Sequence, residues 1–587
     1  MTRCGTLLLV PLVLLSVTAR PSGQTSTWRP VVMADRGMVA SGHPLASEAG
    51  LRILKAGGNA IDAAVAAWAV QGLTEPQMTG LGGDAFILIY LARTREVKFI
   101  NATGPAPRAA TVEFYKSRGG LPADGPLSVI VPGAVGGIEL ALQKYGTRSM
   151  ADVLAPAIEL AEHGFPVTES LANALRRDRD KLARAASTRK IWFDGGEPLQ
   201  MGDRVVQRDY GATLRTIAAH GTAEFYKGRV AETVATYLKS VGGIVDARDL
   251  ASYAPHEDAP ISVNYKGIDV YECPPNSQGF VMLQALNLLE GLDLRYMRHN
   301  SAAYLHAVTE SLKLAFADRN RYVGDPRFVA SIPMRELLSK EYAAKRRALI
   351  DPDRAIVGEA PPGAIAGSAT SAGVRPAYGP PRPVPGLDPT PVIDGHTTYL
   401  AVVDSDRNMV SITSSLLSTF GSGHVAEGAG FFLNNRMAYF SLDESDVNVL
   451  KPGKRPRHTI NPALALKEGR PFVVFGTPGA DTQPQTQLQF FLNVVEFGMN
   501  VQQALEAPAV ISSSFRSSYY PHEVAGKLQV PASLPKHVLD ELASLGHALD
   551  VRAVRGVGSV KAIMIHPKSG ALMGGVSPTG DSYVYGW

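Results

Sequence analysis

The spacing of apolar residues predicts helices along most of the chain. Helical spacing extends over residues 45–56, 60–70, 153–163, 279–290 and 302–321. Asn59, followed by Asp62 three residues later, marks the start of the second helix, and Gly164 marks the end of the third. The second helix is rich in Ala. Small side chains let a helix approach a sheet closely, so we expect this helix to form a buried layer.

Runs of apolar and β-branched residues predict strands in both halves of the chain. These runs cover residues 85–90, 399–404, 409–413 and 472–475, and residues 261–265 and 268–271 alternate as in a β-hairpin. The run over 400–403 is apolar on both faces, which suits a sheet that is covered on each side. The pattern therefore predicts an α+β sandwich with helices as its outer layers.

The composition changes between residues 351 and 396. This segment is rich in Pro, Gly, Ala and Ser and has few large apolar side chains. Such a segment cannot bury enough surface to offset the entropy that ordering would remove. We expect a flexible tail over 351–396, which separates a first part over 29–350 from a second part over 397–587.

Length and charge narrow the class of protein. The chain has 587 residues, of which 45% are hydrophobic and 19% are charged, so it can bury a large core and has room for two to four domains. The formal net charge is +4, and no basic cluster with interleaved aromatic residues is present. This argues against nucleic acid as a partner.

The N-terminal residues predict export. A basic start precedes the apolar run 7–17, and small residues at Val17-Thr18-Ala19 suit cleavage, so residues 1–19 are predicted to be a secretory signal peptide. The run is too short to span a bilayer, and no later run is longer, so we expect a secreted or periplasmic protein without a membrane span. Cys273 then stands alone, which excludes an internal disulfide and favours a packed apolar role. His306, on a predicted helix, is likewise expected to be a packing residue.

The boundary between the tail and the next strand suggests a cut between His396 and Thr397. A terminal Thr carries a β-hydroxyl beside a free α-amine, which makes it a nucleophile with its own base. An α-amine titrates at roughly 7.7–8.0, so much of it can accept a proton near neutral pH. The residue types alone are also typical of an ordinary turn and strand.

Two glycine-rich turns are candidate binding loops. The loop from Gly80 to Asp84 leads into a strand and lacks a following Lys-Ser/Thr pair, so it does not fit a phosphate-binding loop. The turn from Gly476 to Ala480 connects a strand to a helix. Backbone N–H groups at such a turn suit a developing oxyanion.

Five blocks, in order along the chain, resemble the γ-glutamyltranspeptidase family of autoprocessed N-terminal-nucleophile (Ntn) hydrolases. They are residues 43–46 with 57–65, 317–319 with 324–326, 396–404, 433–435 and 476–479. The resemblance implies a four-layer αββα sandwich, the Ntn-hydrolase fold, made as a single precursor. It also implies self-cleavage before Thr397 into a large and a small chain that stay associated, and chemistry that needs no cofactor and no metal.

The resemblance also assigns catalytic roles. Thr397 matches the nucleophile, and Ser415 matches a position where the family usually has a second Thr hydroxyl. Gly479 and Ala480 match the backbone amides of the oxyanion hole. Ala480 replaces the family's second Gly at this site.

The positions that bind a γ-glutamyl group in the family differ here. Thr103, Tyr439, His458 and Thr459 stand where the family holds the α-carboxylate and the α-amine of the substrate. Without a carboxylate at position 439, a bound ammonium group would be buried without a partner. Leu417 and Arg436 replace the family's Asn and Gln. The pattern is more similar to the acylase-like branch, which includes cephalosporin acylases and oxamate amidohydrolases.

Two interpretations of Arg436 remain open. Its guanidinium, alone or with His458, can bind an acidic or carbonyl-bearing acyl group, or it can pair with a structural acid. His458 is open in the same way, as a substrate contact or as a packing residue.

The sequence therefore predicts an exported Thr-nucleophile amidohydrolase or acyltransferase that cleaves small γ-glutamyl or related acyl amides. The alternatives are a glutathione hydrolase or γ-glutamyltransferase proper, and an enzyme like the cephalosporin acylases or oxamate amidohydrolases. A catalytically idle secreted binding protein is a further alternative. A metal hydrolase using His396, His424 and His458 is disfavoured because these residues lack the usual ligand spacing.

Overall fold

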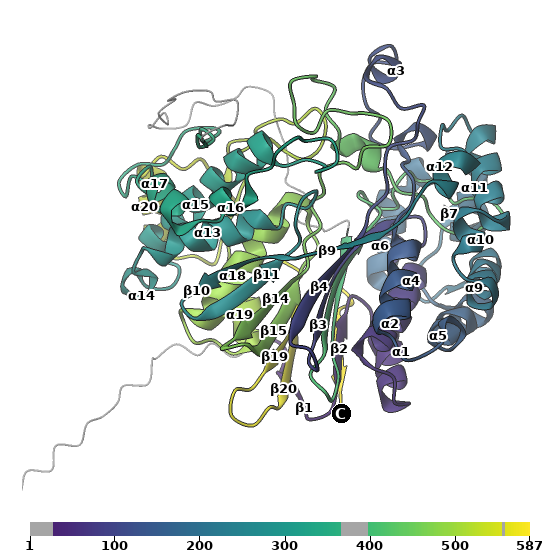
Figure 1. Ribbon diagram of the computed structural model, residues 1–587, viewed down its shortest axis with the longest axis horizontal. Helices are drawn as coiled ribbons and strands as arrows, with labels where there is room; N and C mark the ends of the chain where they lie inside the picture. Colours follow the sequence, from purple (N-terminus) through teal and green to yellow (C-terminus); the bar gives the residue numbers. More distant parts are fainter. Residues whose placement is uncertain (1–26, 366–396, 554–557) are drawn as a thin grey trace, which may run out of the picture.

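The computed structural model describes residues 27–365, 397–553 and 558–587. Two seven-stranded sheets face each other, and helices cover both outer faces (Figure 1). The predicted four-layer αββα sandwich is confirmed. The predicted signal peptide over 1–19, His396 and the tail from residue 366 onward lie outside the described residues.

The first sheet combines strands from both sides of the predicted cut. In spatial order it consists of β21 (Tyr583–Gly586), β2 (Met38–Ser41), β12 (Thr397–Val403), β13 (Met409–Ser415), β3 (Asp84–Leu91), β4 (Glu96–Ala102) and β9 (His256–Asp258). All neighbouring strands are antiparallel. Strands β12 and β13 are thus hydrogen-bonded between strands that come from the first part of the chain.

The second sheet is mixed in the same way. Its order is β1 (Val32–Ala34), β20 (Leu572–Val576), β19 (Lys561–Ile565), β15 (Arg470–Gly476), β14 (Ala463–Lys467), β11 (Ile268–Glu272) and β10 (Ile261–Tyr265). The predicted hairpin is confirmed as β10 and β11. Side chains from both sheets meet in one apolar layer, which includes Phe86, Tyr399, Val474 and Ile563.

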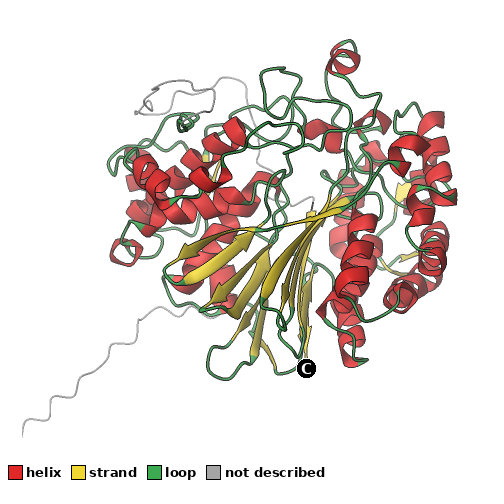
Figure 2. Cartoon of the chain, in the orientation of Figure 1, coloured by secondary structure: helices red, strands yellow, loops and turns green. Residues whose placement is uncertain are grey.

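Helices form the outer layers, as Figure 2 shows in red. The outer face of the first sheet is covered by α1 (Pro44–Lys55), α2 (Ala60–Thr74), α4 (Ala134–Tyr145) and α5 (Met150–His163). The second sheet is covered by α13 (Phe280–Glu290), α15 (Ala302–Tyr322), α18 (Gln483–Val495) and α19 (Val501–Glu506). Further helices extend the first helical layer: α6 (Glu169–Arg177), α8 (Ala186–Trp192), α9 (Arg208–His220) and α11 (Arg229–Ser240).

Three local predictions are confirmed, namely the cap of α2, the burial of α2 and the burial of Cys273. Asn59 and Asp62 form a capping box at the start of α2, every residue of which is buried. Cys273 is fully buried in the layer between the sheets, and burial raises the pKa of its thiol well above the usual range. No helix in the described part of the chain has both the length and the apolar character needed to cross a bilayer.

Residues 351–365 differ from the predicted flexible tail because polar side chains of α15 bind their backbone. His306 Nε2 lies 2.8 Å from the carbonyl oxygen of Asp351. Lys313 donates to the carbonyl of Ile356 at 2.8 Å, and Asp318 accepts from the N–H of Gly363 at 2.7 Å. These bonds satisfy the backbone without large apolar side chains, so the expectation of flexibility is wrong for this part of the tail.

Candidate active site

Thr397 is the first residue of β12 and faces the layer between the two sheets. Side chains alternate along a strand, and Tyr399, Ala401 and Val403 lie in that layer, so Thr397 points the same way. Its hydroxyl donates a hydrogen bond to Ser415 Oγ at 3.0 Å. Ser415 is its register partner on β13 and is fully buried. The structure therefore brings the predicted nucleophile and the predicted second hydroxyl together.

Thr398 faces the opposite side of the sheet. Its hydroxyl lies 3.1 Å from Glu75 Oε2 and accepts a hydrogen bond from Gln71 Nε2 at 2.9 Å. Burial raises the pKa of Glu75 to about 7. Of the two adjacent threonines, Thr397 is thus the one whose hydroxyl faces the layer that contains Ser415.

The predicted oxyanion turn follows β15. Gly479 is followed by the short helix η3 (Ala480–Thr482), and the carbonyl of Gly479 accepts from Thr482 N at 2.8 Å and from Thr482 Oγ1 at 2.7 Å. Within the described ranges, no group accepts a hydrogen bond from the N–H of Gly479 or of Ala480. The N–H of a trans peptide points away from its C=O, so the Ala480 N–H is directed away from Thr482. Two free backbone donors are what an oxyanion hole requires.

Asp84 continues the row of side chains that Thr397 and Ser415 begin. It is the register partner of Ser415 on β3. Its Oδ1 accepts from Gly104 N at 2.9 Å and from Gly133 N at 3.2 Å. Burial raises the pKa of Asp84 to about 6, against the opposing effect of Arg436. No role for Asp84 is predicted from the sequence.

Arg436 and His458 meet the other oxygen of Asp84. Arg436 Nε lies 3.3 Å and His458 Nε2 lies 3.6 Å from Asp84 Oδ2, and all three side chains are fully buried. Burial and the charge of Arg436 lower the pKa of His458 well below its usual range, so the imidazole is neutral. Arg436 therefore has the acidic neighbour that the second interpretation expected.

The guanidinium of Arg436 nevertheless keeps its donors unused. In the part of the chain that the structure describes, none of its nitrogens and neither ring nitrogen of His458 has a hydrogen-bond partner. A buried group that lacks its hydrogen bonds is unfavourable, and a charged one especially so. Although it lies beside Asp84, the Arg436 guanidinium can thus still donate hydrogen bonds to a further acceptor.

The remaining predicted substrate residues lie around this cluster. The guanidinium of Arg436 is 5.3 Å from the centre of the Tyr439 ring, which is 6.0 Å from the His458 ring. Tyr439 and Thr459 share a hydrogen bond of 2.5 Å between their hydroxyls. Thr103 lies next to the Gly104 amide that binds Asp84, but its hydroxyl donates to Asn101 at 2.7 Å. Arg436, Tyr439, His458 and Thr459 thus form one group, and Thr103 lies at its edge.

A cavity of about 400 Å³ adjoins the oxyanion turn. One wall is the turn itself, residues 479–482, and the other is the segment 511–525. Apolar side chains dominate the second wall: Ile511, Phe515, Tyr519, Tyr520 and Pro521.

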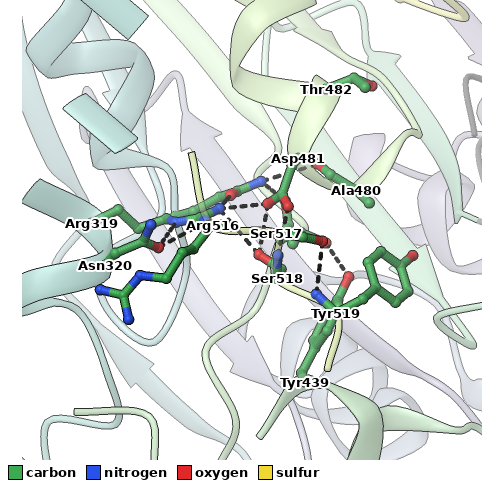
Figure 3. Close-up of polar contacts among 12 residues, drawn as sticks. Arg319, Asn320, Tyr439, Ala480, Asp481, Thr482, Arg516, Ser517, Ser518 and Tyr519 are labelled. Atoms are coloured by element: carbon green, nitrogen blue, oxygen red, sulfur yellow. Dashed lines mark hydrogen bonds and ion pairs between the residues drawn. The ribbon is translucent and has the colours of Figure 1, made fainter. Parts of the chain in front are cut away.

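No role for Arg319 or Asp481 is predicted from the sequence. Figure 3 shows the guanidinium of Arg319 directed at Asp481 and Ser518, immediately beside Ala480. Arg319 belongs to the motif at residues 317–319, but the motif does not show that its partner lies 162 residues away. The only available signal was a charged residue at an otherwise apolar helical position.

Several histidines are candidate metal ligands. His424 Nδ1 lies 2.9 Å from the hydroxyl of Tyr237, His458 lies beside Asp84, and His396 lies outside the described residues. His306, Glu310 and His547 have ligand atoms within 4.8 Å of one another. Lys313 donates to Glu310 at 2.7 Å, and His306 Nδ1 lies 2.9 Å from His547 Nε2. His306 is buried and hydrogen-bonded within the protein, as expected of a packing residue.

Comparison with known proteins gives a consistent result. The profile of the family described as gamma-glutamyltranspeptidase matches residues 46–587. The glutathione hydrolase-like YwrD proenzyme of Bacillus subtilis (strain 168) is 37% identical over 558 residues, which cover 94% of this chain and 99% of that protein. The oxamate amidohydrolase proenzyme of Klebsiella pneumoniae is 32% identical over 565 residues, which cover 94% of this chain and 99% of that protein. The crystal structure of cephalosporin acylase from Bacillus halodurans superposes with a TM-score of 0.83 at 36% identity. The superposition covers 97% of this chain and 99% of the acylase chain.

Proposed function

Since the chain belongs to the γ-glutamyltranspeptidase family of autoprocessed hydrolases and transferases, we propose that Thr397 is the nucleophile that both cuts the chain and attacks the substrate. The observation that carries this assignment is the 3.0 Å hydrogen bond from Thr397 Oγ1 to Ser415 Oγ, on the face of the sheet that points between the two layers. Thr398, on the opposite face, has its hydroxyl bound by Glu75 and Gln71.

The same hydroxyl serves two reactions. In maturation, Thr397 Oγ attacks the carbonyl of His396, the peptide shifts to an ester, and water opens that ester to free the α-amine of Thr397. In turnover, this amine accepts the hydroxyl proton while Oγ attacks the substrate carbonyl, and it then protonates the leaving amine. Water or a second amine releases the acyl group from Thr397.

The N–H groups of Gly479 and Ala480 stabilise the oxyanion of each tetrahedral intermediate. Both donors lack an acceptor within the described residues, so they are available to the substrate. Removing one such donor typically costs about 2.7–4 kcal/mol of transition-state stabilisation.

The acyl group that fits best carries a carboxylate or a carbonyl at its far end. Arg436 offers an unused guanidinium fork, which matches a carboxylate in shape and charge. Asp84, which Arg436 contacts, stands two strands from Thr397, a separation of about 10 Å at the usual strand spacing. A short acyl chain can span that separation. An α-ammonium group on the chain would meet Tyr439 instead of an acid, so a γ-glutamyl group is expected to bind less well than its counterpart without the amine.

The leaving amine is expected to be partly apolar. The cavity beside the oxyanion turn has an aromatic and aliphatic wall, so an amine with an apolar body would bury surface there. We also propose that the protein is exported through residues 1–19 and that the two chains remain associated through their shared sheets.

Intact mass measurement tests the nucleophile. Wild type, Thr397→Ala and Thr398→Ala are purified as full-length chains, and any small chain is sequenced from its N-terminus. We expect wild type and Thr398→Ala to give two chains, with the smaller one starting at residue 397, and Thr397→Ala to remain at the precursor mass. An uncut wild type that hydrolyses amides would rule out the assignment.

A substrate panel tests the acyl group. Glutaryl, γ-glutamyl and butyryl p-nitroanilides share the scissile anilide and differ in the far carboxylate and the amine. We expect kcat/KM to be highest for the glutaryl compound. A preference for the γ-glutamyl compound would instead support a γ-glutamyltransferase proper, and no turnover of any amide by a correctly cut protein would support a binding protein.

A further inference from the structure

Arg319, near the end of α15, is a buried cation with every donor engaged. Its side chain is fully buried, and its guanidinium carbon lies 4.6 Å from the ring centre of Phe316 and 5.6 Å from that of Phe515. It makes hydrogen bonds to Asp481, Gln278, Ser518, Asn320 and the carbonyl of Arg516. The proposed mechanism gives this residue no task.

One of these bonds reaches the oxyanion turn directly. Arg319 NH1 donates to Asp481 Oδ1 at 2.5 Å, and Asp481 is the residue after Ala480 (Figure 3). The same carboxylate accepts from Ser518 N at 2.8 Å and from Ser518 Oγ at 2.6 Å. Asp481 is therefore held from both sides, by α15 and by the loop that contains Ser518.

A second route reaches the turn through Gln278. Arg319 NH1 donates to Gln278 Oε1 at 2.7 Å, which fixes the orientation of the amide. Gln278 Nε2 then donates to the carbonyl of Ala480 at 3.1 Å and to the carbonyl of Thr459 at 2.9 Å. Arg319 thus helps to hold the peptide group that joins Ala480 to Asp481.

The turn needs external support because its backbone is in an unfavourable region. Ala480 has a φ of 49°, which side-chain-bearing residues rarely adopt, and Gly479 has a φ of 123°. Such a conformation persists only where the surroundings fix it. Asp481 and the carbonyl of Ala480 are the points at which Arg319 and its partners do so.

We propose that Arg319 is a positioning residue for the reaction: through Asp481 and Gln278 it fixes the turn whose Gly479 and Ala480 N–H groups stabilise the oxyanion. Its bonds to Arg516 and Ser518 hold the facing wall of the adjoining cavity at the same time. This inference rests on the proposed function, because it presupposes that the two N–H groups act on the substrate.

The test compares two buried arginines of the large chain. Arg319→Lys keeps the charge and loses the fork. Asp481→Asn keeps the size and turns one acceptor into a donor facing the N–H or the hydroxyl of Ser518. The control is Arg346→Lys, because Arg346 is 5% exposed and binds the carbonyls of Leu314 and Pro361 and the carboxylate of Asp318, none of which belongs to the turn. For each variant, kcat and KM on the best anilide are measured per mole of released small chain, together with Tm.

We expect Arg319→Lys and Asp481→Asn to lower kcat by about 10- to 100-fold with KM within about twofold, because the oxyanion exists only after attack. The kcat of the double variant should be no lower than that of the worse single variant, because both changes break the same contact between Arg319 and Asp481. Arg346→Lys should lower Tm and leave kcat within about twofold.

Two results would overturn the inference. One is a cut Asp481→Asn protein with wild-type kcat. The other is an Arg319→Lys protein that, like Arg346→Lys, loses only thermal stability. If Arg319→Lys does not fold, Asp481→Asn decides alone. A wild type that is uncut or inactive contradicts the proposed function itself, so the two failures are distinguishable in the same experiment.

Discussion

Two fully buried arginines flank the reaction site, and they differ in what they bind. The Arg319 guanidinium makes six hydrogen bonds, whereas the Arg436 guanidinium has an acid 3.3 Å away and no hydrogen-bond partner within the described residues. A buried guanidinium whose donors are all used serves the protein that surrounds it. One whose donors are unused is a better candidate for a group that arrives with the substrate. Hydrogen-bond satisfaction therefore separates a positioning role from a binding role where burial alone does not.

The largest expected effect is on stability, and it contrasts the two arginines directly. Arg319→Met leaves Asp481, Gln278 and Asn320 without their partner, and breaking a buried pair of this kind costs about 3–5 kcal/mol. Arg436→Met removes no hydrogen bond, and Asp84 can take up a proton near pH 6, so the free energy of unfolding should stay within about 1 kcal/mol of the parent. Urea-induced unfolding of both variants in the uncut Thr397→Ala chain, at pH 6, measures the difference. Equal losses of unfolding free energy in the two variants would contradict the distinction between Arg319 and Arg436.

The next effect concerns substrate choice. Arg436→Gln should lower kcat/KM on the glutaryl anilide by about 100-fold, or about 2.7 kcal/mol, because the far carboxylate loses a charged, forked donor. The butyryl anilide lacks that carboxylate and should change by no more than about threefold. Arg436→Lys keeps the charge without the fork, so its kcat/KM on the glutaryl anilide should lie between those of wild type and Arg436→Gln. An equal loss of kcat/KM on both anilides would mean that Arg436 stabilises the site and does not select the acyl group.

The smallest effect is on pH dependence. Burial raises the pKa of Asp84 to about 6, so below this pH the carboxyl is neutral and the charge of Arg436 is available to an anion. Above it, the ionised Asp84 competes with the ligand for Arg436, while His458 stays neutral and the charge of Arg455 is constant. The inhibition constant of an alkylsulfonate, whose own charge does not change, should therefore rise by less than about tenfold between pH 5 and pH 7.5. In Asp84→Asn this rise should disappear, and its persistence would point to another titrating group.

Local sequence patterns predicted the sandwich because its elements carry their own signals. The capping box of Asn59 and Asp62, and the doubly apolar run of β12, depend on residues close together in the chain. The same holds for the turn after β15, where glycines stand between a strand and a helix. These features needed no knowledge of distant contacts.

The partners within the site could not be predicted in this way. Asp84 ends a glycine-rich loop, and nothing near it indicates Arg436 or His458, which reach it only after the two sheets have packed. Arg319 likewise meets Asp481 only once α15 lies beside the loop after β15. The order of residues 351–365 could not be predicted for a related reason, because side chains of α15 supply the hydrogen bonds that the composition of this segment does not.

The strand order of the first sheet has a kinetic consequence for the mature enzyme. Strands β12 and β13 lie between β2 and β3, and β21 lies on the far side of β2, so the chain segments before and after Thr397 are interleaved within one hydrogen-bonded sheet. In this sheet, the segment before Thr397 supplies β2 on one side and β3, β4 and β9 on the other, so its strands there are not continuous. The proposed cut before Thr397 would turn the folding of one chain into the association of two, whose strands must interleave. We therefore expect the chain to fold before the proposed cut, and the lifetime of the cut protein to depend on how slowly the two fragments separate.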